Sequence, residues 1–95
     1  MVSVRSEVSP GLRESERTIG VKDFQGHYQY LRVDEDFLVQ SGGAFFLPVG
    51  VVGESDGYVL VELPHEADSG ANRLWVSRDR LLTMEPAHDP VGSRD

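Results

Sequence analysis

The sequence predicts an all-β protein, a small and partly open β-barrel of about six short strands. Short runs rich in Val, Ile, Leu, Tyr and Phe recur along the chain at a spacing of roughly 8–12 residues, and turn residues separate them. No segment shows the long 3.6-residue apolar period of the helix that a βαβ unit requires. Because the chain has 95 residues, we expect a single domain.

Both ends of the chain are predicted to be flexible tails. Residues 1–16 mix Ser, Glu and Arg with Pro10 and Gly11, and they include few large apolar side chains. Residues 84–95 contain two prolines, one glycine and no apolar cluster. The barrel domain is therefore expected to span residues 17–83.

The first two strands are predicted over residues 18–24 and 27–33. In both segments apolar residues alternate with polar or small ones, which is the period of a half-buried strand. Leu31 and Val33 lie on one face of the second strand. Its opposite face carries Tyr28, Tyr30 and Arg32.

An acidic turn and a short strand are expected next. Three adjacent acidic residues, Asp34-Glu35-Asp36, do not suit a strand interior, so we predict a tight turn there. Residues 37–40 are expected to form a short strand that ends at Ser41-Gly42-Gly43.

The stretch from Phe45 to Pro64 predicts a β-hairpin. Two apolar runs rich in β-branched residues flank Glu54-Ser55-Asp56-Gly57, a short polar turn that ends in glycine. Both faces of these strands carry large apolar residues, as expected in a barrel. Pro48 cannot donate a backbone hydrogen bond, so its strand should lie at an edge or begin after it.

The last part of the domain is predicted to contain a loop, a strand and one helical turn. Residues 65–72 are polar and form the loop, and Leu74-Trp75-Val76 forms the strand. Ser77 is a candidate N-cap for a helical turn whose apolar side is Leu81-Leu82.

Composition limits the function classes. The formal net charge is −7, from 9 basic and 16 acidic residues, so binding to a nucleic-acid backbone is disfavoured. The absence of cysteine excludes disulfides and zinc sites with thiolate ligands. No apolar run approaches the length needed to span a bilayer, and the N-terminal residues do not form the apolar region of a secretory signal. We therefore expect a cytoplasmic protein without a membrane span.

Three segments together resemble the PRC-barrel group, a family of small β-barrels. They are Leu31–Leu38 (LRVDEDFL), Phe46–Val52 (FLPVGVV) and Asp56–Val61 (DGYVLV). The resemblance covers about residues 19–63. The group includes the cytoplasmic barrel of the photosynthetic reaction-centre H subunit and the C-terminal barrel of a ribosome-maturation factor. The resemblance implies a small SH3-like barrel that acts as an adaptor without catalysis, and it supplies no ligand-binding residue.

Aromatic residues and one arginine provide the candidate protein-interaction surface. If the tyrosines of the second strand point out of the barrel, they form a patch suited to a protein interface, since aromatic residues and Arg dominate binding hot spots. The alternative is that these rings cap one open end of the core. The candidate residues are Tyr28, Tyr30, Arg32 and Phe46. We therefore predict a non-enzymatic interaction or assembly module that binds a protein partner or associates with itself.

Two other binding functions are weighed as alternatives. His65, Glu66 and Asp68 could hold a metal ion or a small ligand, but they are crowded into four residues, and a solvated loop is the favoured interpretation. Neither a metal nor a cofactor is therefore predicted. A ribosome- or RNA-associated role would use the local basic residues, although Asp79 lies among them and the chain is acidic. Those residues are Arg73, Arg78 and Arg80.

Sequence signatures of catalysis are missing. The chain has no G-x-S-x-G nucleophile motif, and its glycines do not follow the spacing of a phosphate-binding loop. The acidic run at 34–36 lacks the spacing of a calcium-binding loop. We therefore predict that the protein is not an enzyme.

Overall fold

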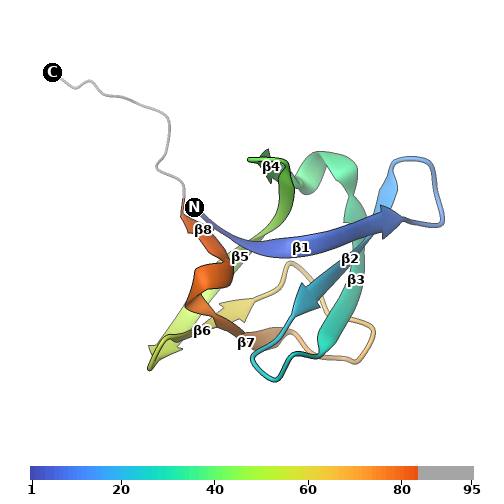
Figure 1. Cartoon of the computed structure of the whole chain (residues 1–95). Coiled ribbons are helices and arrows are strands. Elements are labelled where there is room, and N and C mark those ends of the chain that lie inside the picture. Colours follow the sequence, from blue (N-terminus) through green and yellow to red (C-terminus); the bar gives the residue numbers. More distant parts are fainter. Residues whose placement is uncertain (84–95) are drawn as a thin grey trace, which may run out of the picture.

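A computed structural model describes residues 1–83, in which one antiparallel eight-stranded sheet curls into a half-barrel (Figure 1). The strands are β1 (Val2–Pro10), β2 (Glu16–Lys22), β3 (Tyr28–Asp34), β4 (Val39–Ser41), β5 (Ala44–Ser55), β6 (Tyr58–Glu62), β7 (Arg73–Ser77) and β8 (Leu81–Thr83). Their order across the sheet is β3-β2-β1-β5-β6-β7, with β4 paired to β5 and β8 paired to β1. The predicted all-β, partly open barrel is confirmed, and the predicted tail over 84–95 lies outside the described residues.

β1 is the central strand of the sheet, so the N-terminal tail predicted over residues 1–16 was wrong. One edge of β1 pairs with β5, and the other edge pairs first with β8 and then with β2. Val4 is completely buried in the core. Ser6 also faces the core, where its hydroxyl donates a hydrogen bond to the carbonyl oxygen of Val4 at 3.0 Å. This polar position interrupts an otherwise apolar inner face, which explains why the strand was missed.

β2 and β3 form the hairpin expected from their alternation. Leu31 and Val33 are buried in the core, whereas Tyr28 and Tyr30 lie on the outer face. The predicted acidic turn is a short 3-10 turn, η1 (Glu35–Phe37). It is preceded by Asp34, whose carboxylate accepts a hydrogen bond from the backbone N–H of Asp36.

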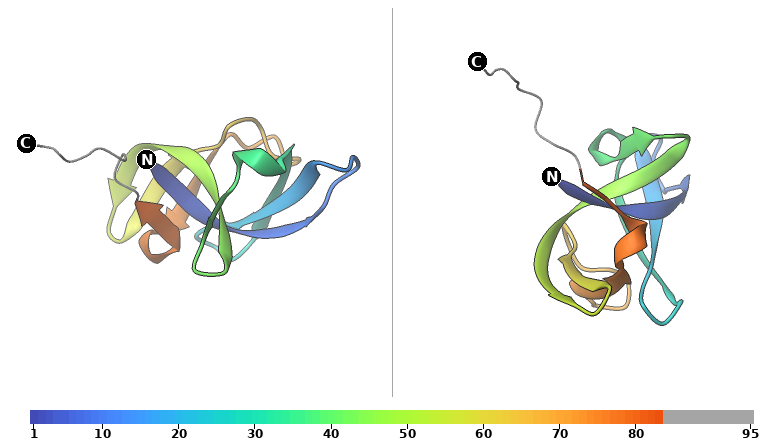
Figure 2. Two further views of the ribbon diagram at one scale, coloured as in Figure 1. Left: turned by 90° about the horizontal axis from the view of Figure 1, so that it is seen from above. Right: turned by 60° about the vertical axis from the view of Figure 1, so that its left-hand side comes forward.

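β5 is a long strand, and it curves strongly along its length (Figure 2). A β-bulge between Val51 and Gly53 interrupts its pairing with β6, and bulges bend the strand that carries them. Pro48 lies between the segment of β5 that pairs with β4 and the segment that pairs with β6. β5 therefore has only β1 beside it at Pro48, which accommodates the missing N–H.

The core fills the space inside the curled sheet. Apolar side chains from both halves of the sheet pack there, and the β6–β7 loop adds two more. The buried apolar residues are Val4, Ile19, Val21, Leu31, Val33, Leu47, Val59, Val61, Leu63, Ala67, Leu74 and Val76. Within the described range, no helix is both long enough and apolar enough to cross a membrane.

The end of the domain matches the prediction only in part, because a strand follows the helical turn. The predicted helical turn is present as the 3-10 turn η2 (Arg78–Arg80) with Ser77 at its N-cap position, but the hydroxyl of Ser77 makes no capping hydrogen bond. Leu81 and Leu82 belong to β8, which pairs with β1. The eight strands therefore exceed the six expected, because β1 and β8 were not recognised.

Candidate binding surfaces

The tyrosine face is the exposed surface formed by Tyr28, Tyr30 and Arg32 on the outside of β3. The two tyrosine rings are stacked, with centroids 6.3 Å apart and an interplanar angle of 25°. They are 38% and 48% exposed. Both rings lean over Gly20 of β2, where an added Cβ atom would lie 3.0 Å from Tyr30 Cε1. The rings therefore cover a glycine on the outer face and do not cap the open end of the core.

Arg32 lies beside the tyrosines but is already engaged. Its guanidinium forms an ion pair with the Asp68 carboxylate of the β6–β7 loop. This hydrogen bond and the charge of Asp68 raise the pKa of Arg32 above its ordinary value. A partner that used Arg32 would share it with Asp68.

Phe46 lies on the same side of the sheet but not next to the tyrosines. It pairs with Arg5 of β1, and Glu7, two residues further along β1, pairs with Gly20 beneath the tyrosine rings. Directly paired residues of an antiparallel ladder point to the same face. The structure therefore brings three of the four predicted residues together and separates Phe46 from them by charged residues of β1.

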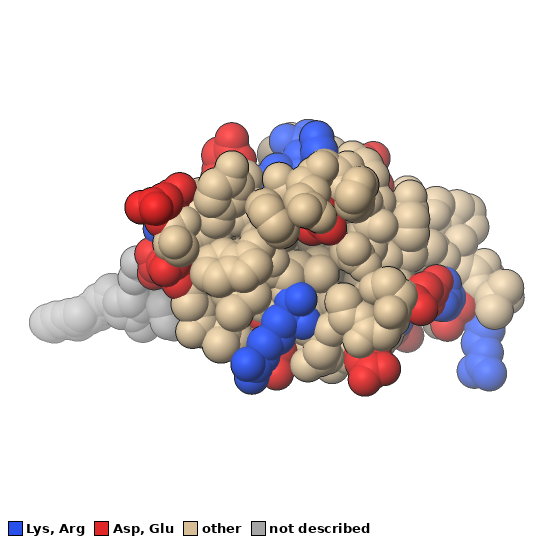
Figure 3. Space-filling model, turned by 90° about the horizontal axis from the view of Figure 1, so that it is seen from below, with Lys and Arg blue, Asp and Glu red and all other residues tan. Residues whose placement is uncertain are grey.

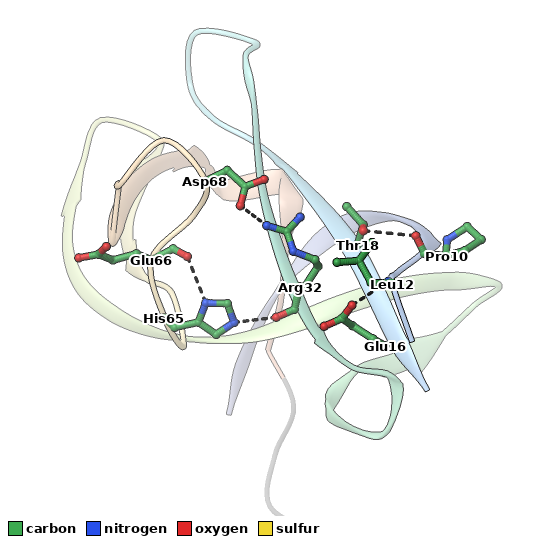
Figure 4. Close-up of polar contacts among 8 residues, drawn as sticks. All are labelled: Pro10, Leu12, Glu16, Thr18, Arg32, His65, Glu66 and Asp68. Atoms are coloured by element: carbon green, nitrogen blue, oxygen red, sulfur yellow. Dashed lines mark hydrogen bonds and ion pairs between the residues drawn. The ribbon is translucent and has the colours of Figure 1, made fainter. Parts of the chain in front are cut away.

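The candidate ligand loop at residues 65–68 packs against the edge of β3 (Figure 4). His65 Nε2 lies 2.7 Å from the carbonyl oxygen of Arg32, and His65 Nδ1 lies 3.1 Å from that of Glu66. The side chains of His65 and Asp68 therefore hold the loop on the sheet. Across residues 1–83, the structure has no group of three His, Asp or Glu side chains arranged to hold a metal ion.

The three arginines considered for RNA binding do not form a common patch. Arg73 pairs with Glu62 at 3.7 Å, and Arg78 pairs with Glu54 at 2.7 Å. Arg80 forms no ion pair with the acidic residues of the described range, 1–83. Figure 3 shows the underside of the molecule, over β6, β7 and the β2–β3 turn, where uncharged side chains predominate and both signs of charge are scattered.

Sequence reasoning missed a second aromatic cluster, which consists of Phe24, Tyr58 and Trp75. The rings of Phe24 and Tyr58 meet edge to face with centroids 6.1 Å apart, and these side chains are 50% and 41% exposed. Trp75 lines the same shallow hollow. The three residues come from the β2–β3 turn, β6 and β7, so no local motif could have indicated that they meet.

Asp23 fixes the turn that carries Phe24. Its carboxylate accepts hydrogen bonds from the backbone N–H groups of Gln25 and His27, at 3.0 and 2.9 Å, and from the side-chain amide of Gln29 at 3.2 Å. Burial acts to raise the pKa of Asp23, but these hydrogen bonds outweigh it and hold the pKa below its ordinary value. The backbone N–H of Phe24 also donates to the carbonyl oxygen of Trp75 at 2.8 Å, which ties the turn to β7.

Comparison of the chain with family models, curated proteins and solved structures gives no significant match. The resemblance to the PRC-barrel group therefore stays a prediction.

Proposed function

We propose that this protein is a non-enzymatic interaction module that binds a partner protein through the tyrosine face. The stacked pair of Tyr28 and Tyr30 supports this proposal most directly. Tyrosine combines a large apolar ring with a hydroxyl, and it is enriched at the centres of protein interfaces.

The arrangement of the two rings also lowers the expected entropic cost of binding. Each ring leans on Gly20, and the backbone beneath them is held in the β2–β3 ladder. Side chains that are already ordered lose less conformational freedom when a partner covers them. Large aromatic side chains left half exposed on a rigid sheet are therefore well suited to association.

The test is the double substitution Tyr28→Ala with Tyr30→Ala in the full chain. Phe37→Ala is the control, because Phe37 is also a half-exposed aromatic residue but belongs to η1. Proteins captured from the native host are first identified with the wild type and purified, and then titrated against each variant. We expect the double variant to weaken binding at least about tenfold and the control to leave it unchanged.

Self-association is measured on the same samples by analytical ultracentrifugation. Circular dichroism and thermal melts establish whether each variant is folded, and the single change Tyr30→Ala serves if the double variant unfolds. A folded tyrosine variant that binds every partner like the wild type, with an unchanged oligomeric state, would contradict the proposal.

A further inference from the structure

Two adjoining hollows open beside the second aromatic cluster and share Phe24 and Tyr58 as a common wall. The first hollow, of about 360 Å³, is aromatic and is completed by Trp75. The second, of about 500 Å³, is more polar and is lined by Lys22 and Arg80 among others. An apolar group and an anion could therefore be held side by side.

Arg80 is the most informative residue of this region. Its Nε and Nη2 atoms are shielded from solvent and make no hydrogen bond to any atom of residues 1–83. By contrast, carboxylates pair with Arg17, Arg32, Arg73 and Arg78. Shielded donors without partners cost free energy. These two donors therefore lose no hydrogen bond to residues 1–83 when Arg80 turns toward an anion in the hollow, and the new ion pair would satisfy them.

The charges around Arg80 limit the kind of anion that fits. Lys22 and Arg80 are balanced in the polar hollow by Asp23 and Asp79, and Asp56 borders the aromatic hollow. Among residues 1–83, neither Asp23 nor Asp79 forms an ion pair with Arg80, although both contribute negative charge to the hollow. A doubly charged phosphate would be repelled by these carboxylates. A single carboxylate could pair with Arg80 at a smaller repulsive cost.

The walls of the two hollows are held by the backbone. Phe24 is tied to β7 through the carbonyl oxygen of Trp75, and the backbone N–H of Arg78 donates to the carbonyl oxygen of Gly57 at 2.9 Å. The β2–β3 turn, the β5–β6 turn and the end of β7 are thus joined. Such a preformed site needs little reorganisation before it binds.

We propose that these two hollows, the aromatic–arginine site, bind a segment of another protein that presents one carboxylate next to a bulky apolar side chain. The apolar side chain enters the hollow formed by Phe24, Tyr58 and Trp75, and the carboxylate pairs with Arg80. The site is separate from the tyrosine face, and the proposal does not depend on that surface.

The test is an NMR titration of the ¹⁵N-labelled full chain with two matched peptides. One is acetyl-Gly-Phe-Glu-Gly-amide, and the other has Gln in place of Glu. The readouts are the indole N–H signal of Trp75 and the Nε–H signal of Arg80. We expect the acidic peptide to shift both signals and to bind about fivefold more tightly than its neutral counterpart.

Two variants locate the source of that preference. Arg80→Gln should make the affinities for the two peptides equal, because it removes only the charged partner. Arg73→Gln is the control and should retain the preference, because Arg73 is exposed and does not line either hollow. Both variants change surface charge by the same amount.

Three results would overturn the proposal. The first is the absence of any shift at Trp75 with millimolar peptide. The second is equal affinity of the wild type for the two peptides. The third is a response of Arg80 and Trp75 to inorganic phosphate or a nucleotide that exceeds the response to the acidic peptide, which would indicate a phosphate site.

Discussion

His65 Nε2 lies 2.7 Å from the carbonyl oxygen of Arg32, and this contact joins the β6–β7 loop to β3. The backbone N–H of Asp68 also donates to the carbonyl oxygen of Tyr30 at 2.7 Å. β3 is the terminal strand of the sheet order, so its outer edge would otherwise present unpaired backbone groups. The loop therefore takes the place of a further strand at the open edge of the half-barrel.

Replacement of His65 should weaken the attachment of the β6–β7 loop to β3. We expect His65→Ala to lower the free energy of unfolding by about 1 kcal/mol, since the contact to the Arg32 carbonyl is lost. Hydrogen exchange at the Asp68 amide should become faster, because the loop opens more often. Glu66→Ala is the control, because that side chain is exposed. Unchanged exchange at Asp68 in His65→Ala would show that the histidine does not hold the loop.

Because β1 is the central strand of the sheet, we expect a substitution of Val4 to destabilise the protein. The side chain is fully buried, so Val4→Ala should lower the free energy of unfolding by about 2 kcal/mol through lost apolar burial and an unfilled cavity. Urea unfolding monitored by Trp75 fluorescence measures the change. Val52→Ala removes the same atoms from a half-exposed position and should have little effect. Equal stabilities of the two variants would be incompatible with a core strand at residues 2–10.

The β5–β6 turn should depend on Gly57, which follows Asp56 in the turn. Asp56 and Gly57 have φ angles of 44° and 86°, both in the left-handed region that favours glycine. Gly57→Ala is expected to cost about 1–2 kcal/mol of unfolding free energy. Gly50→Ala is the matched control, because Gly50 does not have a positive φ and an added Cβ would meet only Glu62 Cβ at 3.8 Å. Chemical denaturation of both variants makes the comparison.

Acid should weaken the β2–β3 turn through Asp23. Its folded-state pKa lies below the ordinary value of an aspartate, so the ionised carboxylate stabilises the folded state. This contribution is complete above the unfolded-state pKa and is lost as the pH falls through the lower folded-state pKa. The stability difference between the wild type and Asp23→Asn should therefore shrink below about pH 4.

Two measurements check this prediction for Asp23. NMR titration of the Asp23 carboxyl carbon gives the folded-state pKa directly, and urea unfolding at neutral and acidic pH gives the stability difference. A carboxyl pKa at or above the ordinary value, or a stability difference that is constant with pH, would show that the hydrogen bonds to Asp23 do not favour its charged form.

Local alternation was enough to predict the elements whose two faces differ in polarity. Leu31 and Val33 alternate with tyrosines and arginine, and the structure places the two sets on opposite faces. The β5–β6 hairpin was equally clear, because a turn ending in glycine lies between two apolar runs. Each signal is contained in a short run of adjacent residues, so no knowledge of tertiary contacts was needed.

The elements that were missed depend on contacts between distant residues. β8 has only three residues, and its pairing with β1 defines it as a strand. Ser6 is tolerated on the inner face because its hydroxyl donates a hydrogen bond to the carbonyl oxygen of Val4. The meeting of Phe24 with Tyr58 results from the curl of the whole sheet. Sequence periodicity does not encode such proximity.

The pairing of Val2–Val4 with Leu81–Thr83 bears on the order of events during synthesis. β1 leaves the ribosome before the other described strands and can pair with β2 along Ser6–Pro10, but the rest of its edges lack neighbours until β5 and β8 have been made. The β2–β3 and β5–β6 hairpins need only local contacts and can form early. We therefore expect the sheet to be completed only after β8 has emerged. Until then one end of β1, Val2–Val4, has an unpaired edge, the kind of segment that a chaperone would shield.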